Sequence, residues 1–394
     1  MATRSRLLSV LSLLSLMVLG SAIPSPVQAE KDPDPGAYGS YIRQAHADLE
    51  SGKPQEARAA LEKTDRTRRN FEFDYLLARA EKPDGGAAGS PDLVRSVSLP
   101  DVEVRYGVLN ELERQVVYIC RDGSLRVYDL AAPDKPLKSV AHPGGSAVWS
   151  GEFSHDGKTF LSGHQNGELL VWDAAKWEVR HTVPIGEAWP VRELAVGPDG
   201  LAFVAENKQE LELWQIGPEG PKKIAGVGPR YNFGEGLAFS PAGDLVATGG
   251  MFDILLHDAK TGAQVHSLSH ASYTMGLEFS PDGKSIASAP RGNVNRFLAV
   301  FDVKGTEPRF NAGPFGHYVA GMSFTPDGKR IVATGCEKLL RIFDAETGEI
   351  ILQLPRPECS SKPAFTRDGR LLGWSEPAGY RFIDLGKGEE PDRK

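Results

Sequence analysis

Short runs of alternating apolar and polar residues, separated by turns, recur along the chain from residue 92 to about residue 385. In SIAS (285–288), as in many of these runs, every second side chain falls on the same face, as in a half-buried β-strand. The run follows SPDG (280–283), a turn in which proline fixes an early φ and glycine supplies a late positive one. The repeated pattern predicts an all-β domain built from hairpins.

A dipeptide of an aromatic residue and aspartate, or a degenerate relative of it, marks each repeat. Consecutive marks are 40 to 44 residues apart, close to the period of about 40–45 residues of a four-stranded propeller blade. The seven marks are Tyr128-Asp129, Trp172-Asp173, Trp214-Gln215, His257-Asp258, Phe301-Asp302, Phe343-Asp344 and Ile383-Asp384. The spacing predicts a seven-bladed β-propeller over residues 92–394.

The seventh blade lacks an outer strand after Asp384, because only a polar, glycine-containing tail remains. Residues 92–100 alternate like an outer strand and precede the first blade. We therefore expect them to pair with the strand that contains Arg381 and Asp384. This pairing would close the ring and leave only short, protected strand edges. The residues from about 386 onward are expected to form a flexible tail.

Residues 38–80 have the apolar spacing of helices. The residues on one face of the first helix are Tyr38, Ile42, Ala45 and Leu49. Gly52 ends this helix, Pro54 suits the first turn of a second one, and a third covers 71–80. Such a small helical module, 30–91 with its linker at 81–91, cannot bury a core alone. We expect it to dock on the propeller. The residues expected at this contact are Leu49, Leu61, Phe71 and Tyr75.

The first 29 residues have the features of a secretory signal peptide. Arg4 and Arg6 precede an uncharged apolar run over 7–19, and VQA (27–29) suits a cleavage site. We expect cleavage before Glu30 and export to the periplasm, the cell envelope or the extracellular space. An uncleaved membrane anchor is the alternative, although the run is shorter than the about 20 residues that span a bilayer. No other segment approaches that length, so no integral membrane span is expected after cleavage.

Composition and charge narrow the function. Of the 394 residues, 40% are hydrophobic and 25% are charged, and the net charge is −7. Such a surface has no general attraction for nucleic acid or anionic lipid. The closest histidine pair in the propeller, His266 and His270, would be about 13 Å apart along a strand. The sequence lacks nucleophile-elbow, phosphate-loop and Cys-x-x-Cys motifs. We expect no metal, no cofactor and no enzyme activity.

Three segments resemble repeats of the WD-repeat family: FSPDGKSIAS (279–288), GHQNGELLVWD (163–173) and LLRIFDAETGEI (339–350). The stretch over 49–61 resembles a tetratricopeptide helix hairpin, and RRNFEFDYL (68–76) resembles a segment found before WD repeats in exported bacterial proteins. The resemblance implies a rigid ring whose loops bind other proteins. The family's polar tetrad is incomplete here. The second blade offers His142, Ser162, Asn166 and Trp172, with asparagine in place of aspartate.

The resemblance also implies a preferred binding face, formed by the turns between the second and third strands and by the loops that enter each first strand. Aromatic residues and arginines at such positions are typical of interface hot spots. The partner-binding candidates are Trp149, Trp189, Arg192, Tyr231, Phe233, Phe252, Tyr273, Arg291 and Tyr318. The alternative is that these side chains pack between neighbouring blades.

The expected function is that of a monomeric, non-enzymatic interaction scaffold that binds a protein partner. Two alternatives come from other classes: a dispersed-loop enzyme such as a lactonase-like hydrolase, and a glycan- or ligand-binding surface protein. The chain has three cysteines, so at most one internal disulfide can form. In the family geometry, the segments that carry Cys336 and Cys359 reach the same face. This makes them the candidate disulfide in an oxidising compartment, with three free thiols as the alternative.

Overall fold

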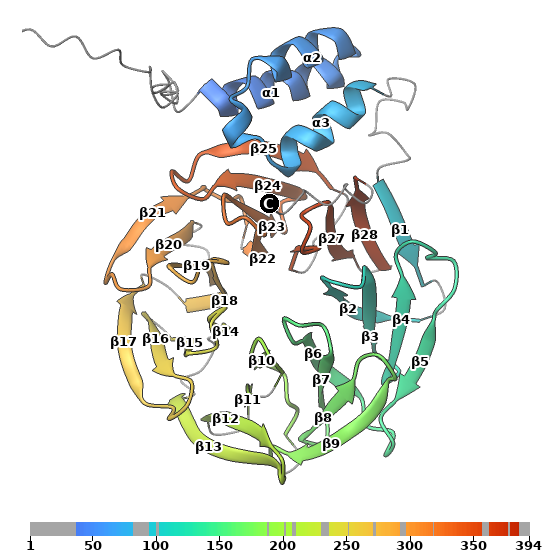
Figure 1. The fold of residues 1–394 in the computed structure, drawn as a ribbon, viewed down its shortest axis with the longest axis vertical. Helices are drawn as coiled ribbons and strands as arrows, with labels where there is room; N and C mark the ends of the chain where they lie inside the picture. Colours follow the sequence, from blue (N-terminus) through green and yellow to red (C-terminus); the bar gives the residue numbers. More distant parts are fainter. Residues whose placement is uncertain are drawn as a thin grey trace, which may run out of the picture. The chain divides into compact units, whose positions relative to one another are not determined.

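The computed structural model describes most of the chain between Ala37 and Leu385. The described residues are 37–81, 94–99, 102–186, 189–200, 202–206, 210–229, 236–250, 252–270, 273–291, 297–317, 319–356, 362–376 and 379–385. They all belong to one compact unit, Gly36–Lys394. The described residues form seven four-stranded sheets set in a ring, with three α-helices against the outside of the ring (Figure 1). The predicted seven-bladed β-propeller is confirmed.

The first six blades are meanders of four consecutive strands, which run from the centre of the ring outward (Figure 1). Blades one to three comprise β2 (Val104–Asn110), β3 (Gln115–Cys120), β4 (Ser124–Asp129) and β5 (Lys138–Ala141); β6 (Val148–Phe153), β7 (Thr159–His164), β8 (Glu168–Asp173) and β9 (Glu178–Pro184); and β10 (Leu194–Val196), β11 (Ala202–Glu206), β12 (Glu210–Gly217) and β13 (Gly220–Pro229). Blades four to six comprise β14 (Leu237–Phe239), β15 (Leu245–Gly249), β16 (Asp253–Asp258) and β17 (Gln264–Ser269); β18 (Tyr273–Phe279), β19 (Ser285–Arg291), β20 (Leu298–Asp302) and β21 (Pro308–Ala312); and β22 (Val319–Phe324), β23 (Arg330–Gly335), β24 (Leu339–Asp344) and β25 (Ile350–Pro355).

Blade seven takes its outer strand from the other end of the propeller. It comprises β26 (Ala364–Phe365), β27 (Leu371–Glu376), β28 (Gly379–Asp384) and β1 (Val94–Ser98). Strand β1 pairs antiparallel with β28, so that Val94 lies opposite Ile383 and Ser98 lies opposite Gly379. The predicted closure of the ring is therefore confirmed, and the outer edge of β28 is covered by a strand that precedes blade one.

The turns that follow the first strands have the geometry that their sequence predicts. Gly283 adopts φ +69°, and its N–H donates to the Ser280 carbonyl at 2.8 Å. The Asp282 carboxylate accepts a hydrogen bond from the Ser280 hydroxyl at 2.7 Å and one from the Lys284 N–H at 3.1 Å. The aspartate side chain thus holds the two ends of the turn together. The repeated Asp-Gly pairs therefore stabilise hairpins.

A partial polar network lies inside blade two. The Trp172 Nε1–H donates to Ser162 Oγ at 2.8 Å, and Ser162 Oγ lies 2.8 Å from His164 Nε2. The expected place of His142 in this network is wrong: His142 Nε2 lies 2.8 Å from the Glu168 carboxylate, and its ring packs 4.4 Å from that of His164. His164 takes the position because it lies two residues from Ser162 on the same strand face. Burial and the neighbouring His142 lower the pKa of His164 to about 4.

The helical module docks on the outside of blades six and seven. It comprises α1 (Ala37–Glu50), α2 (Pro54–Glu62), a 3₁₀ turn (η1, Arg66–Arg68) and α3 (Phe71–Glu81), and Figure 1 shows it against β24 and β25. One apolar cluster joins the two parts, with Leu49 partly buried at its margin. Its members include Tyr38, Ile42, Leu61, Phe71 and Tyr75 from the helices and Ile342, Ile351, Leu352, Phe365 and Trp374 from the blades. The predicted docking is confirmed.

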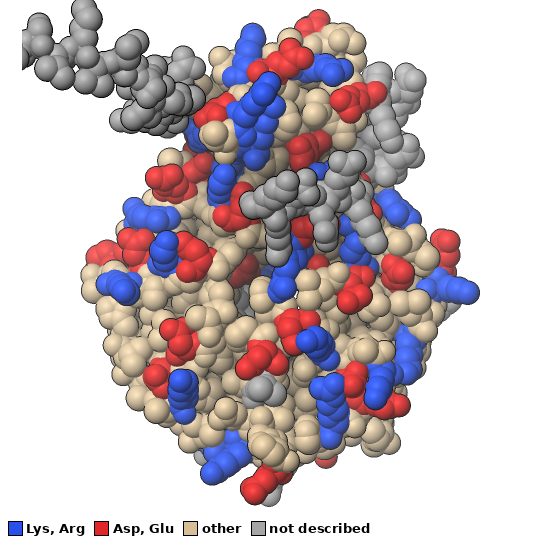
Figure 2. Space-filling view, viewed as in Figure 1, with Lys and Arg blue, Asp and Glu red and all other residues tan. Residues whose placement is uncertain are grey.

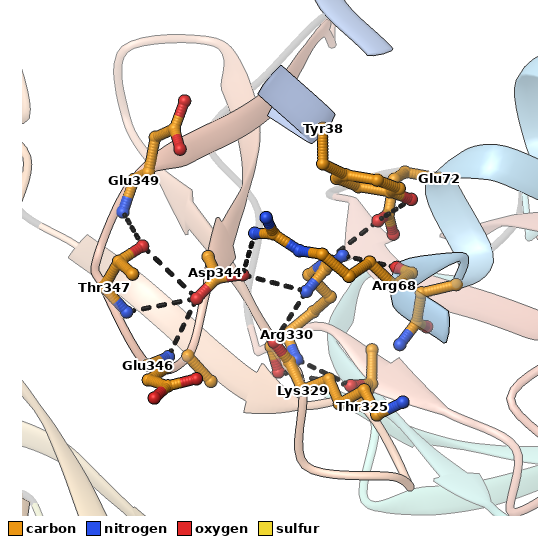
Figure 3. Close-up of polar contacts among 12 residues, drawn as sticks. Tyr38, Arg68, Glu72, Thr325, Lys329, Arg330, Asp344, Glu346, Thr347 and Glu349 are labelled. Carbon is orange, nitrogen blue, oxygen red and sulfur yellow. Dashed lines mark hydrogen bonds and ion pairs between the residues drawn. The ribbon is translucent and has the colours of Figure 1, made fainter. Parts of the chain in front are cut away.

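A buried ion-pair network adds a polar link at this contact (Figure 3). The side chains of Arg330 on β23 and Glu72 on α3 are 2% and 0% exposed. Arg330 Nε donates to Glu72 Oε1 at 2.8 Å, and its Nη1 donates to Asp344 Oδ2 at 3.1 Å. The Tyr38 hydroxyl donates to the same Glu72 oxygen at 2.8 Å, and Arg68 pairs with Asp344 at 3.3 Å. Burial raises the pKa of Glu72, and Arg330 opposes that rise.

Several sequence predictions fall on residues outside the described part of the chain. They concern the signal peptide at 1–29, most of the linker at 81–91 and the tail after Leu385. Among the residues that the structure describes, no helix has the length and apolar character needed to cross a membrane.

Candidate functional site

The topology brings four of the nine candidate residues to one end of the ring. Because successive strands of a blade are antiparallel, the turns between second and third strands lie at the same end as the loops that enter the next first strand. We call this end the loop face. Trp149 is the second residue of β6, Trp189 and Arg192 precede β10, and Phe252 precedes β16. By this topology all four lie at the loop face, and their role in binding stays a prediction.

The structure places the other five candidates less completely. Tyr273 is the first residue of β18 and Arg291 is the last of β19, and their strand positions alone are described. The remaining three, Tyr231, Phe233 and Tyr318, lie outside the described residues. The membership of these five in a binding patch stays a prediction.

Trp149, Trp189 and Arg192 come together with an arginine from blade one. The guanidinium carbon of Arg105 lies 3.8 Å from the centroid of the Trp149 ring. That of Arg192 lies 5.0 Å from Trp149 and 5.5 Å from Trp189. The Trp149 Nε1–H donates to the Gln165 side-chain oxygen in the adjoining turn. These cation–π contacts define an arginine–tryptophan cluster, made of Arg105, Trp149, Trp189 and Arg192, that spans blades one to three.

Two β-bulges explain why Arg105 and Trp149 are neighbours. The pairing of β2 with β3 shifts register between Val104 and Tyr106, and that of β6 with β7 shifts between Val148 and Ser150. Arg105 and Trp149 are thus the unpaired residues of equivalent bulges in successive blades. A bulge re-aims the side chain that it leaves out of the ladder, and bulges are frequent beside functional sites.

Arg192 occupies the same place in blade three. It lies four residues before Val196, the last residue of β10, just as Trp149 lies four residues before Phe153, the last residue of β6. The innermost strands of blades one and two, and the residues that lead into the innermost strand of blade three, therefore place arginine, tryptophan and arginine at equivalent positions. Trp189 comes from the loop before β10 and extends this row. Phe252 belongs to blade four, where its side chain is 64% exposed.

The charge of the cluster is not neutralised by the described residues. Neither Arg105 nor Arg192 forms a hydrogen bond or an ion pair there, and Arg105 Nε is buried without an acceptor. Burial and the nearby Arg121 guanidinium lower the pKa of Arg105, which Glu103 partly opposes. Glu103 forms an ion pair with Arg121, with 2.8 Å between Arg121 Nε and the carboxylate. An arginine keeps its charge even so.

Sequence reasoning missed Arg105 because its blade lacks the turn that sets the register elsewhere. Blades two to seven have an Asp-Gly or Ala-Gly turn after the first strand, from which candidate positions can be counted back. Blade one has Glu111-Leu112-Glu113-Arg114 at this place. The register of β2 then depends on its pairing with β3, which the sequence does not reveal.

A second group of charged residues lies on the first strands of blades two and five and just before the first strand of blade seven. Lys362 Nζ pairs with Glu278 Oε2 at 3.0 Å, and Glu278 Oε1 accepts hydrogen bonds from the Ser323 hydroxyl at 3.0 Å and the Phe324 N–H at 2.9 Å. Burial raises the pKa of Glu152 to about 7, which Lys362 partly opposes. Glu278 therefore ties blades five, six and seven together.

The described residues contain no group of three or more histidine, cysteine or carboxylate side chains arranged to hold a metal ion. Cys120 is a buried free thiol and Cys336 is disulfide-bonded. Cys359 lies outside the described residues, so its pairing with Cys336 stays a prediction.

Comparison with known proteins supports one class. Two segments, residues 134–173 and 312–344, match the family model "WD domain, G-beta repeat". Each match runs from an outer strand into the third strand of the next blade, as a repeat of this type does. The β-propeller domain of Cps50 (Swd1) from Myceliophteria thermophila aligns with a TM-score of 0.62 at 15% identity, over 75% of this chain and 100% of that one. The fold and these matches support a WD-repeat β-propeller.

Curated relatives agree over shorter stretches. Transducin beta-like protein 3 from Rattus norvegicus is 34% identical over 104 residues, which are 24% of this chain and 13% of that protein. Guanine nucleotide-binding protein subunit beta-1 from Drosophila melanogaster is 24% identical over 145 residues, which are 36% of this chain and 42% of that protein. The chain thus spans less than half the length of the curated relatives that it matches.

Proposed function

We propose that this protein is an exported, non-enzymatic scaffold that binds a protein partner on the loop face of its propeller. The arginine–tryptophan cluster carries the proposal. Tryptophan and arginine are among the residue types enriched at interface hot spots. Here Arg105 and Trp149 project from bulges on the innermost strands of blades one and two, and Trp189 and Arg192 project from the loop that leads into blade three. A rigid ring lowers the conformational cost of presenting them.

The likeness to guanine nucleotide-binding protein subunit beta-1 adds support, because that protein's name identifies it as a subunit of an assembly. The signal-like sequence at 1–29 supports export. The polar groups of blade two that could suggest chemistry, Ser162 and His164, are fully buried within the blade and hydrogen-bond to each other, and Ser162 also accepts a hydrogen bond from Trp172. Their place favours a structural role over that of an exposed nucleophile and base.

Site-specific photo-crosslinking in the native cells tests the proposal. p-Benzoylphenylalanine is placed at Phe252, which is 64% exposed at the loop face, and at Leu137, which is 58% exposed next to the outer strand of blade one. The two positions match in exposure and polarity but differ in location.

We expect a discrete protein adduct from position 252, no adduct of that size from position 137, and loss of the adduct when Trp149→Ala and Arg192→Ala are added. An unchanged melting temperature shows that the fold is kept. Equal adducts from both positions, or adducts that persist in the double variant, would refute a partner on the loop face.

A further inference from the structure

In the part of the chain that the structure describes, the two arginines of the arginine–tryptophan cluster form no ion pair, on a protein whose net charge is −7. Among the described residues, Arg105 and Arg192 contact aromatic rings and form no hydrogen bond or ion pair, and Arg105 Nε remains a buried donor without an acceptor. A buried donor that stays unpaired is costly. An unneutralised pair of guanidinium groups at a surface therefore fits a site whose acceptors come from a bound molecule.

We propose that the arginine–tryptophan cluster is a receptor for an acidic peptide segment, in which Arg105 and Arg192 bind carboxylates and Trp149 and Trp189 pack on the apolar atoms between them. The proposal rests on the proposed function and names the chemistry of the partner. A guanidinium presents paired donors that match both oxygens of a carboxylate.

Stacking makes these arginines better receptors than free surface arginines. The Arg105 guanidinium lies 3.8 Å from the Trp149 centroid, and Arg192 lies within 5.5 Å of two indole rings. These contacts restrict the rotamers of both side chains, so less entropy is lost when a carboxylate binds. The bulges in β2 and β6 fix the backbone from which the first arginine and the first tryptophan project.

The surroundings favour a short acidic segment over a long polyanion. Glu103 pairs with Arg121 beside the cluster, and both Glu193 and Glu152 lie close enough to Tyr106 to affect its pKa. Tyr106 follows Arg105 directly. In the view of Figure 2, acidic and basic side chains are interspersed over the propeller. A nucleic-acid backbone would meet these carboxylates repeatedly, whereas a peptide can place two acidic side chains at the arginines.

Fluorescence anisotropy with the full-length protein tests the proposal. The probe is the fluorescein-labelled peptide Ser-Gly-Asp-Glu-Leu-Asp-Glu-Gly, and its control is the amide peptide Ser-Gly-Asn-Gln-Leu-Asn-Gln-Gly of the same size. We expect the acidic peptide to bind about tenfold more tightly than the amide peptide. We expect Arg105→Gln with Arg192→Gln to remove this preference, while Arg58→Gln on α2 leaves it unchanged. Circular dichroism melts confirm that the variants are folded.

Three results would overturn the proposal: equal affinity for the two peptides, an unchanged acidic preference in the double variant, or an oligothymidylate that binds as tightly as the acidic peptide and with the same arginine dependence. The crosslinking experiment is independent of these. A loop-face adduct without any acidic preference would keep the scaffold and remove the acidic receptor. Arginine-dependent peptide binding without an adduct would support the proposed acidic-peptide site and contradict the proposed scaffold function.

Discussion

Replacing Arg330 by methionine should show how much the buried ion pair, as distinct from the apolar cluster, contributes to the stability of the contact between the helices and the propeller. In the folded protein the change leaves Glu72 fully buried, with the Tyr38 hydroxyl as its remaining side-chain donor. Removing one partner of a buried ion pair typically costs about 3–5 kcal/mol, because the other charge stays desolvated. This is a large share of the about 5–15 kcal/mol that stabilises a typical domain.

The double variant Arg330→Met with Glu72→Leu removes both charges and keeps most of the side-chain volume. Asp344 retains Arg68 at 3.3 Å and the backbone donors of Glu346 and Thr347 at 3.0 and 3.1 Å. No buried charge is then left alone, so the double variant should be at least about 2 kcal/mol more stable than the sum of the two single variants implies.

Urea unfolding followed by tryptophan fluorescence measures these free energies, since Trp374 belongs to the apolar cluster at the contact. Arg180→Met is the matched control: Arg180 pairs with Asp173 at 2.6 Å, but its side chain is 47% exposed, so its loss should cost no more than about 1 kcal/mol. Limited trypsin digestion should release the helical module first from Arg330→Met. Additive effects within about 0.5 kcal/mol, or a loss no larger than that of the control, would refute the reasoning.

Four further predictions concern the ring and the site. Trp149→Ala, at a half-buried residue, should weaken partner binding by more than about 1 kcal/mol in a titration while the melting temperature changes little; a sharp fall in melting temperature with normal binding by the folded fraction would mean blade packing. Deleting 92–100 should uncover β28 and cause aggregation in light scattering, and an unchanged monomer would contradict the closure argument. Thiol titration of denatured, non-reduced protein should find one free group, Cys120, and three would exclude the disulfide. The raised pKa of Glu152, about 7 against 4.5, means that the folded state holds this proton more tightly than the unfolded chain; its stabilisation is present below pH 4.5 and lost as the pH rises through 7. Glu152→Gln should therefore gain melting temperature over wild type between about pH 5 and pH 8, and an equal difference at both would refute the shift; the opposite contribution of His164 cancels in this comparison because both proteins contain it.

The features that could be predicted from sequence are those that short, repeated sequence motifs specify. The turn at 280–283 and its equivalents specify a positive φ at glycine and a side-chain cap by aspartate, and both are present. The marks such as Phe343-Asp344 then give the period. Closure by β1 followed because an outer strand was missing at one end of the propeller and available at the other. Each inference needed only neighbouring residues and a count.

The features that were missed depend on contacts between distant segments. Arg330 and Glu72 are 258 positions apart, and each has the sequence environment of an ordinary surface residue on a strand or helix. Their burial arises only when α3 covers the end of β23. Arg105 was missed because its position on a bulge is set by pairing with β3, and His142 was misplaced because its contact with Glu168 is decided by side-chain reach. Periodicity carries no information about such choices.

The buried ion-pair network and the arginine–tryptophan cluster lie in different blades, so stability and binding can be changed separately. The Arg330 network and the β1–β28 pairing both stabilise blades six and seven, where the chain enters and leaves the propeller. The arginine–tryptophan cluster belongs to blades one to three, and none of its described contacts involves the helices. Arg330→Met should therefore lower the free energy of unfolding while the folded fraction binds the acidic peptide normally. Arg192→Gln should weaken binding of the acidic peptide and leave the free energy of unfolding nearly unchanged. If Arg330→Met weakened peptide binding in protein shown to be folded, the two regions would be coupled through the ring, and the cluster could no longer be treated as a preformed site.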